Sequence, residues 1–359
     1  MAPTAKDLEL DAIAKDVQFV GRLFGSLQRP GTPERVVSIA PLSVIAFLAL
    51  FVYEAEGKLS LAPTWRAADT ERVMARSRHA LKLFDDTKRD LEGQVAFFRD
   101  EIEPAHRRRF LRPIPWPWAK DLGIYKYEDR PISNTHVASF LTGYDPPKLF
   151  TRGMSDELRS IASDYGRYFA ALGASLDPTA ESFASRWDSS RLKGVDERAD
   201  RYYRGLFAGA TSREINPLLG LFQALINFAT FVLPLDPVPE SWQTIFKIRF
   251  LTLYHVLSGL AKLRASGRIS PSGGAAHLDA ILNTSEAATL LSSSVRPVRN
   301  TLMHYGPDPR LALTSLDLGM PLYGLPEACC GGRDAPWLES VVTKQIELTA
   351  AELQAWAGA

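Results

Sequence analysis

The feature that most constrains the fold is a run of eighteen residues without a charged side chain, from Val36 to Tyr53. An α-helix that is apolar on all sides is either buried in a large hydrophobic core or crosses a membrane. The length is close to the shortest that spans a bilayer, about 17–25 residues. Pro41 fits the first turn of such a helix. The sequence therefore predicts a helix at 36–53 and leaves two environments open, a protein core or a membrane.

A second uncharged run extends from Ile215 to Leu235, with a proline near each end. Three amide side chains interrupt it, those of Asn216, Gln223 and Asn227. Amides are costly in lipid and are easier to accommodate among packed helices. We expect this run to form a core helix.

Apolar residues recur every three or four positions in several other segments, the spacing of amphipathic helices. We expect these helices near residues 5–28, 70–103, 158–172, 241–265 and 336–356. No sustained two-residue alternation flanked by hairpin turns is present, which argues against a large sheet. The sequence predicts an all-α protein.

The length of 359 residues suggests about two domains, since a domain usually has about 100–200 residues. A turn-rich break at 208–213 separates a helical N-terminal region, 1–209, from a C-terminal helical domain, 210–359. Seven prolines between 104 and 153 exclude one long helix there. We expect an irregular segment at 104–153.

The charge balance and the cysteine content limit the partners and the compartment that we expect. Forty-two Lys and Arg face 41 Asp and Glu, so no global charge favours nucleic acid and any RNA contact must be local. The two cysteines, Cys329 and Cys330, are adjacent, which suits neither a disulfide framework nor a metal site and favours a reducing compartment. The polar N-terminus lacks a signal-peptide pattern. We expect a cytoplasmic protein, with membrane association through Val36–Tyr53 as the alternative.

The segment 296–307 carries the residue types of a catalytic site. It is expected to form a short helix that begins near Pro297 and stops at Gly306-Pro307. Asn300 and His304 are four residues apart and share a face, while Arg299 lies about 100° around the helix. A guanidinium can hold phosphate oxygens, and an imidazole can transfer protons at neutral pH. This set suits cleavage of an RNA phosphodiester and needs no metal.

The pattern Arg299-Asn300-x-x-x-His304 resembles the signature of HEPN ribonucleases, Arg-x4–6-His with a polar residue after the arginine. The aromatic Tyr305 and the order of long helices around the motif are also similar, over about residues 210–359. The resemblance implies an up-and-down helical bundle that forms a homodimer. Two motifs then build a metal-independent RNase site without a cofactor, often in a toxin or an antiviral (phage-defence) effector with an antitoxin or sensor partner.

Other interpretations of the same residues remain open. Arg299 and His304 can simply be cations that stabilise a helix C-terminus, and His255 is expected to be a packed core residue. The basic stretch Arg107-Arg108-Arg109, followed by Trp116 and Trp118, suits single-stranded RNA through phosphate contacts and stacking. It also fits a solvated charge run beside acidic neighbours.

Two functions therefore compete. The first is an endoribonuclease with Arg299, Asn300 and His304 as catalytic residues and with Tyr305 and Arg107–Arg109 as binding residues. Its N-terminal region would sense, anchor or inhibit. The second is a non-catalytic HEPN-like module that binds RNA or protein, with or without a membrane anchor. A dimer in which each His304 faces the other subunit's motif across an open cleft favours the first. A motif buried against the N-terminal half, or one that faces solvent alone, favours the second.

Overall fold

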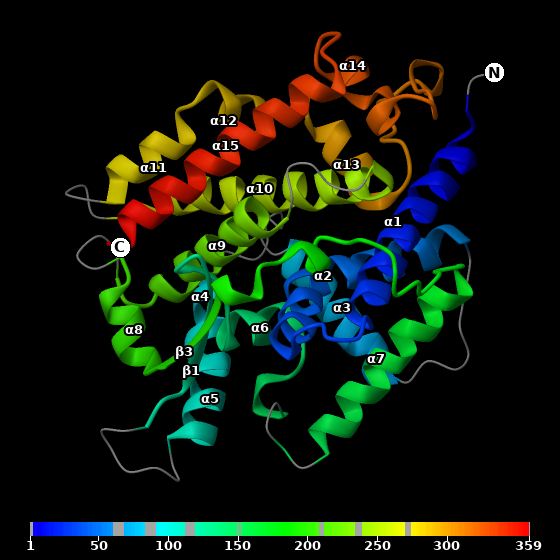
Figure 1. Ribbon diagram of the computed structural model, residues 1–359. Coiled ribbons are helices and arrows are strands. Elements are labelled where there is room, and N and C mark those ends of the chain that lie inside the picture. Colours follow the sequence, from blue (N-terminus) through cyan, green and yellow to red (C-terminus); the bar gives the residue numbers. More distant parts are fainter. Residues whose placement is uncertain are drawn as a thin grey trace.

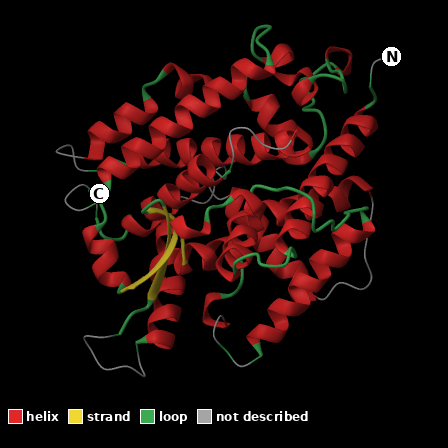
Figure 2. Cartoon of the chain, in the orientation of Figure 1, coloured by secondary structure: helices red, strands yellow, loops and turns green. Residues whose placement is uncertain are grey.

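The computed structural model describes residues 3–59, 68–82, 91–111, 119–148, 151, 153–207, 212–233, 239–269 and 274–358. Helices make up most of this part of the chain, and the strands form one small sheet (Figure 2). The expectation of a mainly helical protein is confirmed.

The N-terminal half contains eight α-helices and three strands among the described residues: α1 (Ala5–Leu27), α2 (Glu34–Leu59), α3 (Ala68–Lys82), α4 (Leu91–Phe97), α5 (Glu103–Phe110), β1 (Leu122–Tyr127), β2 (Arg130–Asn134), α6 (Thr135–Thr142), α7 (Met154–Ala171), β3 (Leu192–Glu197) and α8 (Ala199–Gly205). The C-terminal half contains α9 (Asn216–Asn227), α10 (Trp242–Ala265), α11 (Gly274–Leu282), α12 (Ser285–Leu290), α13 (Arg296–His304), α14 (Leu325–Cys329) and α15 (Ala335–Trp356). Short π-helical turns follow α4 and α9, at Phe98–Ile102 and Phe228–Val232.

Figure 1 shows the C-terminal helices α9 to α15 as one layer and the N-terminal helices beneath it. Helix α1 crosses from the lower layer to the motif helix α13, and α10 runs through the middle of the molecule. Helix α9 packs against both α10 and α15. Gly259 of α10 allows the close approach, because a Cβ there would lie 2.5 Å from the ring of Phe222.

Side chains from both halves belong to one hydrophobic core. The core extends from Leu8 and Val20 of α1, through α2, to Leu253 of α10 and Leu338 of α15. The boundary expected at 209/210 lies outside the described residues and stays a prediction. The two halves fold against each other through shared apolar burial, which is the main favourable contribution to folding.

The apolar run Val36–Tyr53 forms most of α2, which packs against α1, α3, α6 and α7. Among the described helices, α2 is the one long and apolar enough to cross a membrane, and 67% of its most apolar window is buried inside the protein. Its outward positions include the exposed Val37 and Tyr53. The fold thus gives α2 a protein environment along most of its surface.

The segment 104–153 was expected to be irregular, and this expectation was wrong for its described residues. It contains α5, the hairpin β1–β2 and α6, and β3 joins β1 on its other edge in the antiparallel order β2-β1-β3. Glu128 and Asp129 make the hairpin turn with φ of 50° and 62°. This turn lacks the glycine that usually signals such a conformation. Residues 112–118, with three of the prolines, lie outside the description.

The other helices agree with the periodicity. Helix α1 matches the expected 5–28, α10 matches 241–265 and α15 matches 336–356. The expected helix at 215–235 is α9 with its π-helical turn. The expected helix at 70–103 corresponds to α3 and α4, with residues 83–90 outside the description. The expected 158–172 lies within α7, except for its last residue.

A pair of buried histidines lies beside the hairpin. The rings of His106 (α5) and His136 (α6) are 4.4 Å apart between centroids. His106 Nε2 contacts Ser139 Oγ at 2.9 Å, and His136 Nδ1 contacts the hydroxyl of Tyr203 at 3.2 Å. Burial lowers the pKa of His106 to about 4, and burial together with the neighbouring His106 lowers the pKa of His136 well below 6.5.

We predict that acid destabilises the protein through this pair. The folded state binds protons less readily than the unfolded state, so stability is full above about pH 6.5 and is lost as pH falls toward 4. From His106 alone the loss between pH 7.5 and pH 5 should be about 2 kcal/mol. Thermal unfolding of wild type and of a His106→Asn/His136→Asn variant across this range measures it. An identical pH dependence for both proteins would contradict the prediction.

We also predict that α2 does not hold the protein in a membrane, because most of its apolar surface already contacts protein. The full-length chain should stay in the supernatant after ultracentrifugation without detergent. Any membrane-bound fraction should be released by alkaline carbonate. Material that stays in the pellet after carbonate treatment would show that lipid, rather than the core, covers α2.

Candidate functional site

The motif residues lie on and just beyond α13, a helix of nine residues packed against α10 and α14. Pro297 occupies the first turn, as expected. The helix ends at His304, before the expected stop at Gly306-Pro307, because Tyr305 itself adopts the left-handed conformation with φ of 57°. For a residue with a side chain this conformation costs about 1–2 kcal/mol. Contacts of the Tyr305 side chain must therefore hold it.

Arg299 and Asn300 line an open cleft of about 330 Å³, together with Arg296, Asp308 and Arg310. Arg299 Nη1 donates to Asn300 Oδ1 at 2.7 Å, and Asn300 Nδ2 donates to Asp308 Oδ2 at 2.7 Å. Arg310 holds the same carboxylate with Nε and Nη2, at 2.7 and 2.8 Å. The four side chains thus form one hydrogen-bonded chain along the cleft.

The cleft carries a surplus of positive charge. Three guanidinium groups, from Arg296, Arg299 and Arg310, line it beside one carboxylate. The hydrogen bonds from Arg310 lower the pKa of Asp308 far below its usual value, so this carboxylate is ionised and offsets one charge. Burial lowers the pKa of Arg299, yet a guanidinium stays protonated at neutral pH. An anionic group is the ligand that such a cleft favours.

His304 does not line this cleft. It lies one helical turn after Asn300, and its Nδ1 is 3.1 Å from Oε2 of Glu54 on α2. The other oxygen of Glu54 accepts from Arg78 of α3 at 3.0 Å. Burial would raise the pKa of Glu54, but the hydrogen bond and charge of His304, with the charge of Arg78, lower it. About 37% of the His304 side chain remains exposed.

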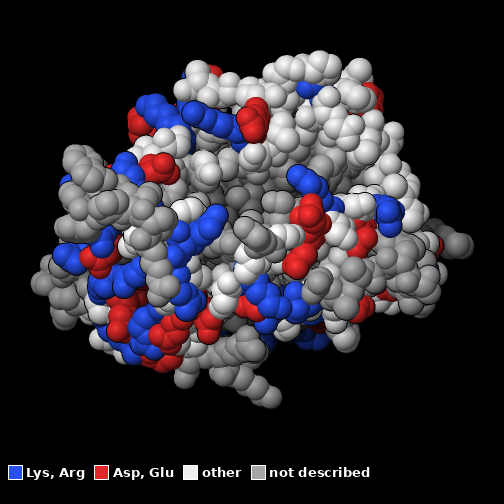
Figure 3. All heavy atoms as spheres, turned by 90° about the horizontal axis from the view of Figure 1, so that it is seen from below, with Lys and Arg blue, Asp and Glu red and all other residues white. Residues whose placement is uncertain are grey.

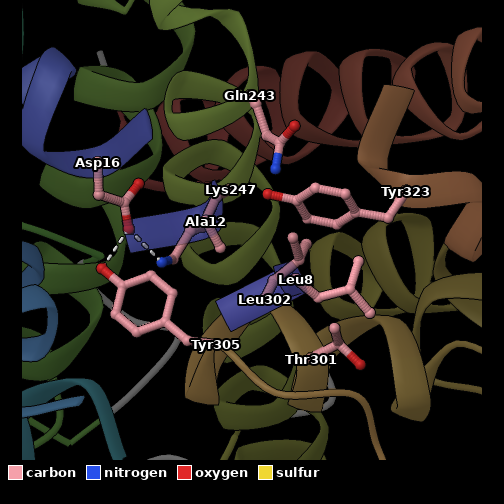
Figure 4. Close-up of a pocket in the computed structure, with 9 residues that line it drawn as sticks. All are labelled: Leu8, Ala12, Asp16, Gln243, Lys247, Thr301, Leu302, Tyr305 and Tyr323. Carbon is pink, nitrogen blue, oxygen red and sulfur yellow. Dashed lines mark hydrogen bonds and ion pairs between the residues drawn. The ribbon is translucent and has the colours of Figure 1, made fainter. Parts of the chain in front are cut away.

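Tyr305, expected as a binding residue, is buried, with 2% of its surface exposed. Its hydroxyl donates to Asp16 on α1 (Figure 4). The same carboxylate accepts from Lys247 at 2.6 Å and from Thr244 at 2.7 Å, both on α10. Lys247 also lies over the ring of Tyr305, 4.1 Å from its centroid. These contacts fix the left-handed residue.

The buried cluster around Asp16 is structural rather than a substrate site. Figure 4 shows Asp16, Lys247 and Tyr305 meeting beside Tyr323 and Gln243. The cavity between them measures about 20 Å³, room for about one water molecule. Burial lowers the pKa of Lys247 and raises that of Tyr305. The ammonium and carboxylate compensate each other at the junction of α1, α10 and α13.

The remaining candidates lie elsewhere. Arg107, Arg108 and Arg109 are exposed on α5, at the opposite end of the molecule from α13 (Figure 1). On the face seen from below, Lys and Arg intermingle with Asp and Glu (Figure 3). Arg213 forms ion pairs with Asp200 and Glu103. Trp116 and Trp118 lie outside the described residues. His255 is buried in α10, as expected for a core residue.

The described residues contain no cluster of three or more His, Cys, Asp or Glu side chains suited to a metal ion. Comparison of the chain with models of known families, with curated proteins and with solved structures finds no match. The resemblance to HEPN ribonucleases rests on the Arg299-Asn300-x-x-x-His304 motif and on the helices around it.

Sequence reasoning missed the carboxylates that surround the motif, Asp16, Glu54 and Asp308, and the cations Arg78 and Lys247. One local signal existed for Asp308, since Asp308-Pro309-Arg310 begins only four residues after the helix ends at His304. Asp16 and Glu54 come from helices far away in the chain, and no spacing in the sequence connects them to the motif.

We predict that Asp16→Ala strongly destabilises the protein, because it leaves the buried Lys247 without its counter-ion and removes the acceptor of Tyr305. Breaking a buried pair from one side costs about 3–5 kcal/mol. Chemical denaturation monitored by circular dichroism measures the free energy of unfolding. Asp156→Ala is the matched control: its carboxylate is 81% exposed in a surface pair and should contribute about 0–1 kcal/mol. Equal effects of the two variants would refute the structural role of Asp16.

Proposed function

We propose that this protein is a metal-independent endoribonuclease of the HEPN type that acts in the cytoplasm as a toxin or phage-defence effector. The observation that carries the proposal is the positive cleft of Arg296, Arg299 and Arg310 one helical turn from a partly exposed imidazole. Asn300, which lines that cleft, and His304 are four residues apart, about 6 Å along the helix axis.

The chemistry needs only these side chains and the RNA itself. Arg299 holds the non-bridging phosphate oxygens and stabilises the charge that builds up as the 2′-hydroxyl oxygen attacks phosphorus. His304 accepts the proton of that hydroxyl or donates one to the departing 5′-oxygen. The new P–O bond and the broken P–O bond leave a 2′,3′-cyclic phosphate and a 5′-hydroxyl. Asn300, bonded to Arg299, orients the guanidinium.

A homodimer would complete the site. Because His304 does not line the cleft of its own chain, one chain offers an anion-binding cleft and, outside it, an imidazole that contacts Glu54. A second copy related by a two-fold axis would bring a second motif next to the first, and a two-fold axis is the commonest symmetry of soluble oligomers. An antitoxin or a sensor would then control access to the composite site.

One observation favours a second candidate. The motif packs against the N-terminal half, with His304 on Glu54 and Tyr305 on Asp16. That arrangement suits a non-catalytic HEPN-like module that binds RNA or protein, with α2 as a membrane anchor in one version. It equally suits an effector in its inactive state. Measuring RNA cleavage by variants of the motif distinguishes the ribonuclease from the binding module.

We predict that Arg299→Ala and His304→Ala each lower RNA cleavage by about 10²–10⁴-fold, the usual effect of losing a phosphate-stabilising contact or a general acid–base. Asn300→Ala should have a smaller effect, since it orients and transfers no proton. Cleavage of a labelled RNA by the purified, activated dimer measures the rates. His277→Ala is the matched control, because His277 is also partly exposed and paired with a glutamate, Glu352.

The mechanism also fixes the products. Cleavage should continue in EDTA, give 2′,3′-cyclic phosphate ends, and fail on a substrate with a 2′-deoxy nucleotide at the cut site. Loss of activity in EDTA would rule out the mechanism. If His304→Ala alters only the melting temperature and no RNA is cut by the activated wild type, the binding module is the correct function.

A further inference from the structure

The residue that contacts His304 most directly comes from outside the C-terminal domain. Glu54 lies on α2, at the end of the apolar run, about 250 residues before His304 in the chain. Its side chain is 10% exposed, and its two oxygens have different partners. Oε2 contacts Nδ1 of His304 at 3.1 Å, and Oε1 accepts from Nη2 and Nε of Arg78 at 3.0 and 3.3 Å.

We propose that Glu54 is the positioning residue of His304: its carboxylate holds the neutral ring in the Nδ1–H tautomer and leaves Nε2 as the nitrogen that accepts a proton. The catalytic meaning of this contact rests on the function proposed above. An ionised carboxylate only accepts hydrogen bonds, so the imidazole nitrogen facing it must carry the hydrogen. In the neutral ring, Nε2 is then the nitrogen without a hydrogen, and it can accept a proton.

Arg78 makes the carboxylate a fixed reference point. Its guanidinium packs over the ring of Tyr53, 3.7 Å from the centroid, and its own side chain is 14% exposed. A guanidinium has donors and no acceptor, so it always requires an oxygen on the side of Glu54 that faces it. Arg78 of α3 thus holds the carboxylate of Glu54 on α2 in place, and the partly exposed ring of His304 contacts its free oxygen, Oε2.

In this geometry the N-terminal half orients the catalytic histidine of the motif. The motif has the polar residues of an RNase site, but the group that selects the reactive nitrogen of His304 lies on α2 and is anchored from α3. Carboxylates that orient a histidine in this manner set which nitrogen performs the chemistry. The C-terminal domain is incomplete without them.

Glu54→Gln tests the proposal sharply, because the amide has one oxygen and one NH₂ group. Arg78 takes the oxygen, and the NH₂ then faces His304 and donates to Nδ1. The ring must move its hydrogen to Nε2, so the substitution inverts the tautomer. Imidazole ¹⁵N shifts of the histidine-labelled protein, recorded at alkaline pH, report the tautomer directly. The chain has six histidines, and His304→Gln assigns the signal.

The expected result is the Nδ1–H tautomer in wild type and the Nε2–H tautomer in Glu54→Gln. Glu34→Gln, an exposed substitution in the first turn of the same helix, should leave the wild-type pattern intact. A wild-type spectrum of the Nε2–H tautomer overturns the proposal without any variant, so poor folding of Glu54→Gln does not rescue it. An unchanged tautomer in folded Glu54→Gln overturns it as well.

Kinetics separate this proposal from the proposed function. In the cleavage assay Glu54→Gln should lower kcat by on the order of 10²-fold or more with KM little changed, since it disables the base and leaves the cleft intact. Inversion of the tautomer in a wild-type protein that cuts no RNA would support the positioning contact and reject the ribonuclease. If the protein cuts RNA but the tautomer of His304 is the same in wild type and Glu54→Gln, the ribonuclease is supported and the positioning contact is rejected.

Discussion

The buried carboxylate of Asp16 is the interaction on which the arrangement of the motif depends. It joins three helices that are far apart in the chain, because α1 provides the acceptor, α10 provides Lys247 and Thr244, and Tyr305 follows α13. A charge buried in a low-dielectric interior is tolerated only when it is paired and hydrogen-bonded. Three donors meet that requirement here. Any shift of α13 relative to α1 or α10 would break at least one of these bonds in the core.

Fixing Tyr305 also holds the C-terminal end of α13 in place, and with it the direction of the motif side chains on that helix. Successive residues of a helix are about 100° apart, so the position of one end determines where the others point. With Tyr305 turned inward to Asp16, His304 meets Glu54, and Arg299 and Asn300 face the open cleft with Asp308 and Arg310. The separation of the imidazole from the cleft therefore follows from the buried contacts of Asp16. A change in α1 that moves Asp16 would also move the motif side chains at the surface.

Periodicity was sufficient to locate the long helices, because each buries one continuous stripe and the stripe is visible in a local window. It also placed Pro297 at the start of the motif helix and His255 in the core. It was insufficient for the hairpin, since Glu128 and Asp129 adopt positive φ without a glycine. It also gave no sign that Tyr305 is buried, because the sequence around an aromatic residue beside a histidine is the same whether its hydroxyl meets a ligand or a carboxylate from another helix. Partners such as Asp16 and Glu54 are defined by tertiary packing, which has no fixed spacing in the sequence.

The environment of α2 and the arrangement of the motif depend on each other, because α2 carries Glu54, which contacts His304. Glu54 is the first charged residue after the apolar run Val36–Tyr53, so the residue that meets His304 lies just where a membrane span would emerge. A helix in lipid cannot also pack against α1, α3, α6 and α7, and these contacts hold Glu54 within reach of His304 and Arg78. Moving α2 into a bilayer would therefore expose the apolar core and remove the carboxylate from the motif together. Burial of α2 in the protein is the condition under which Glu54, Arg78 and His304 form one site.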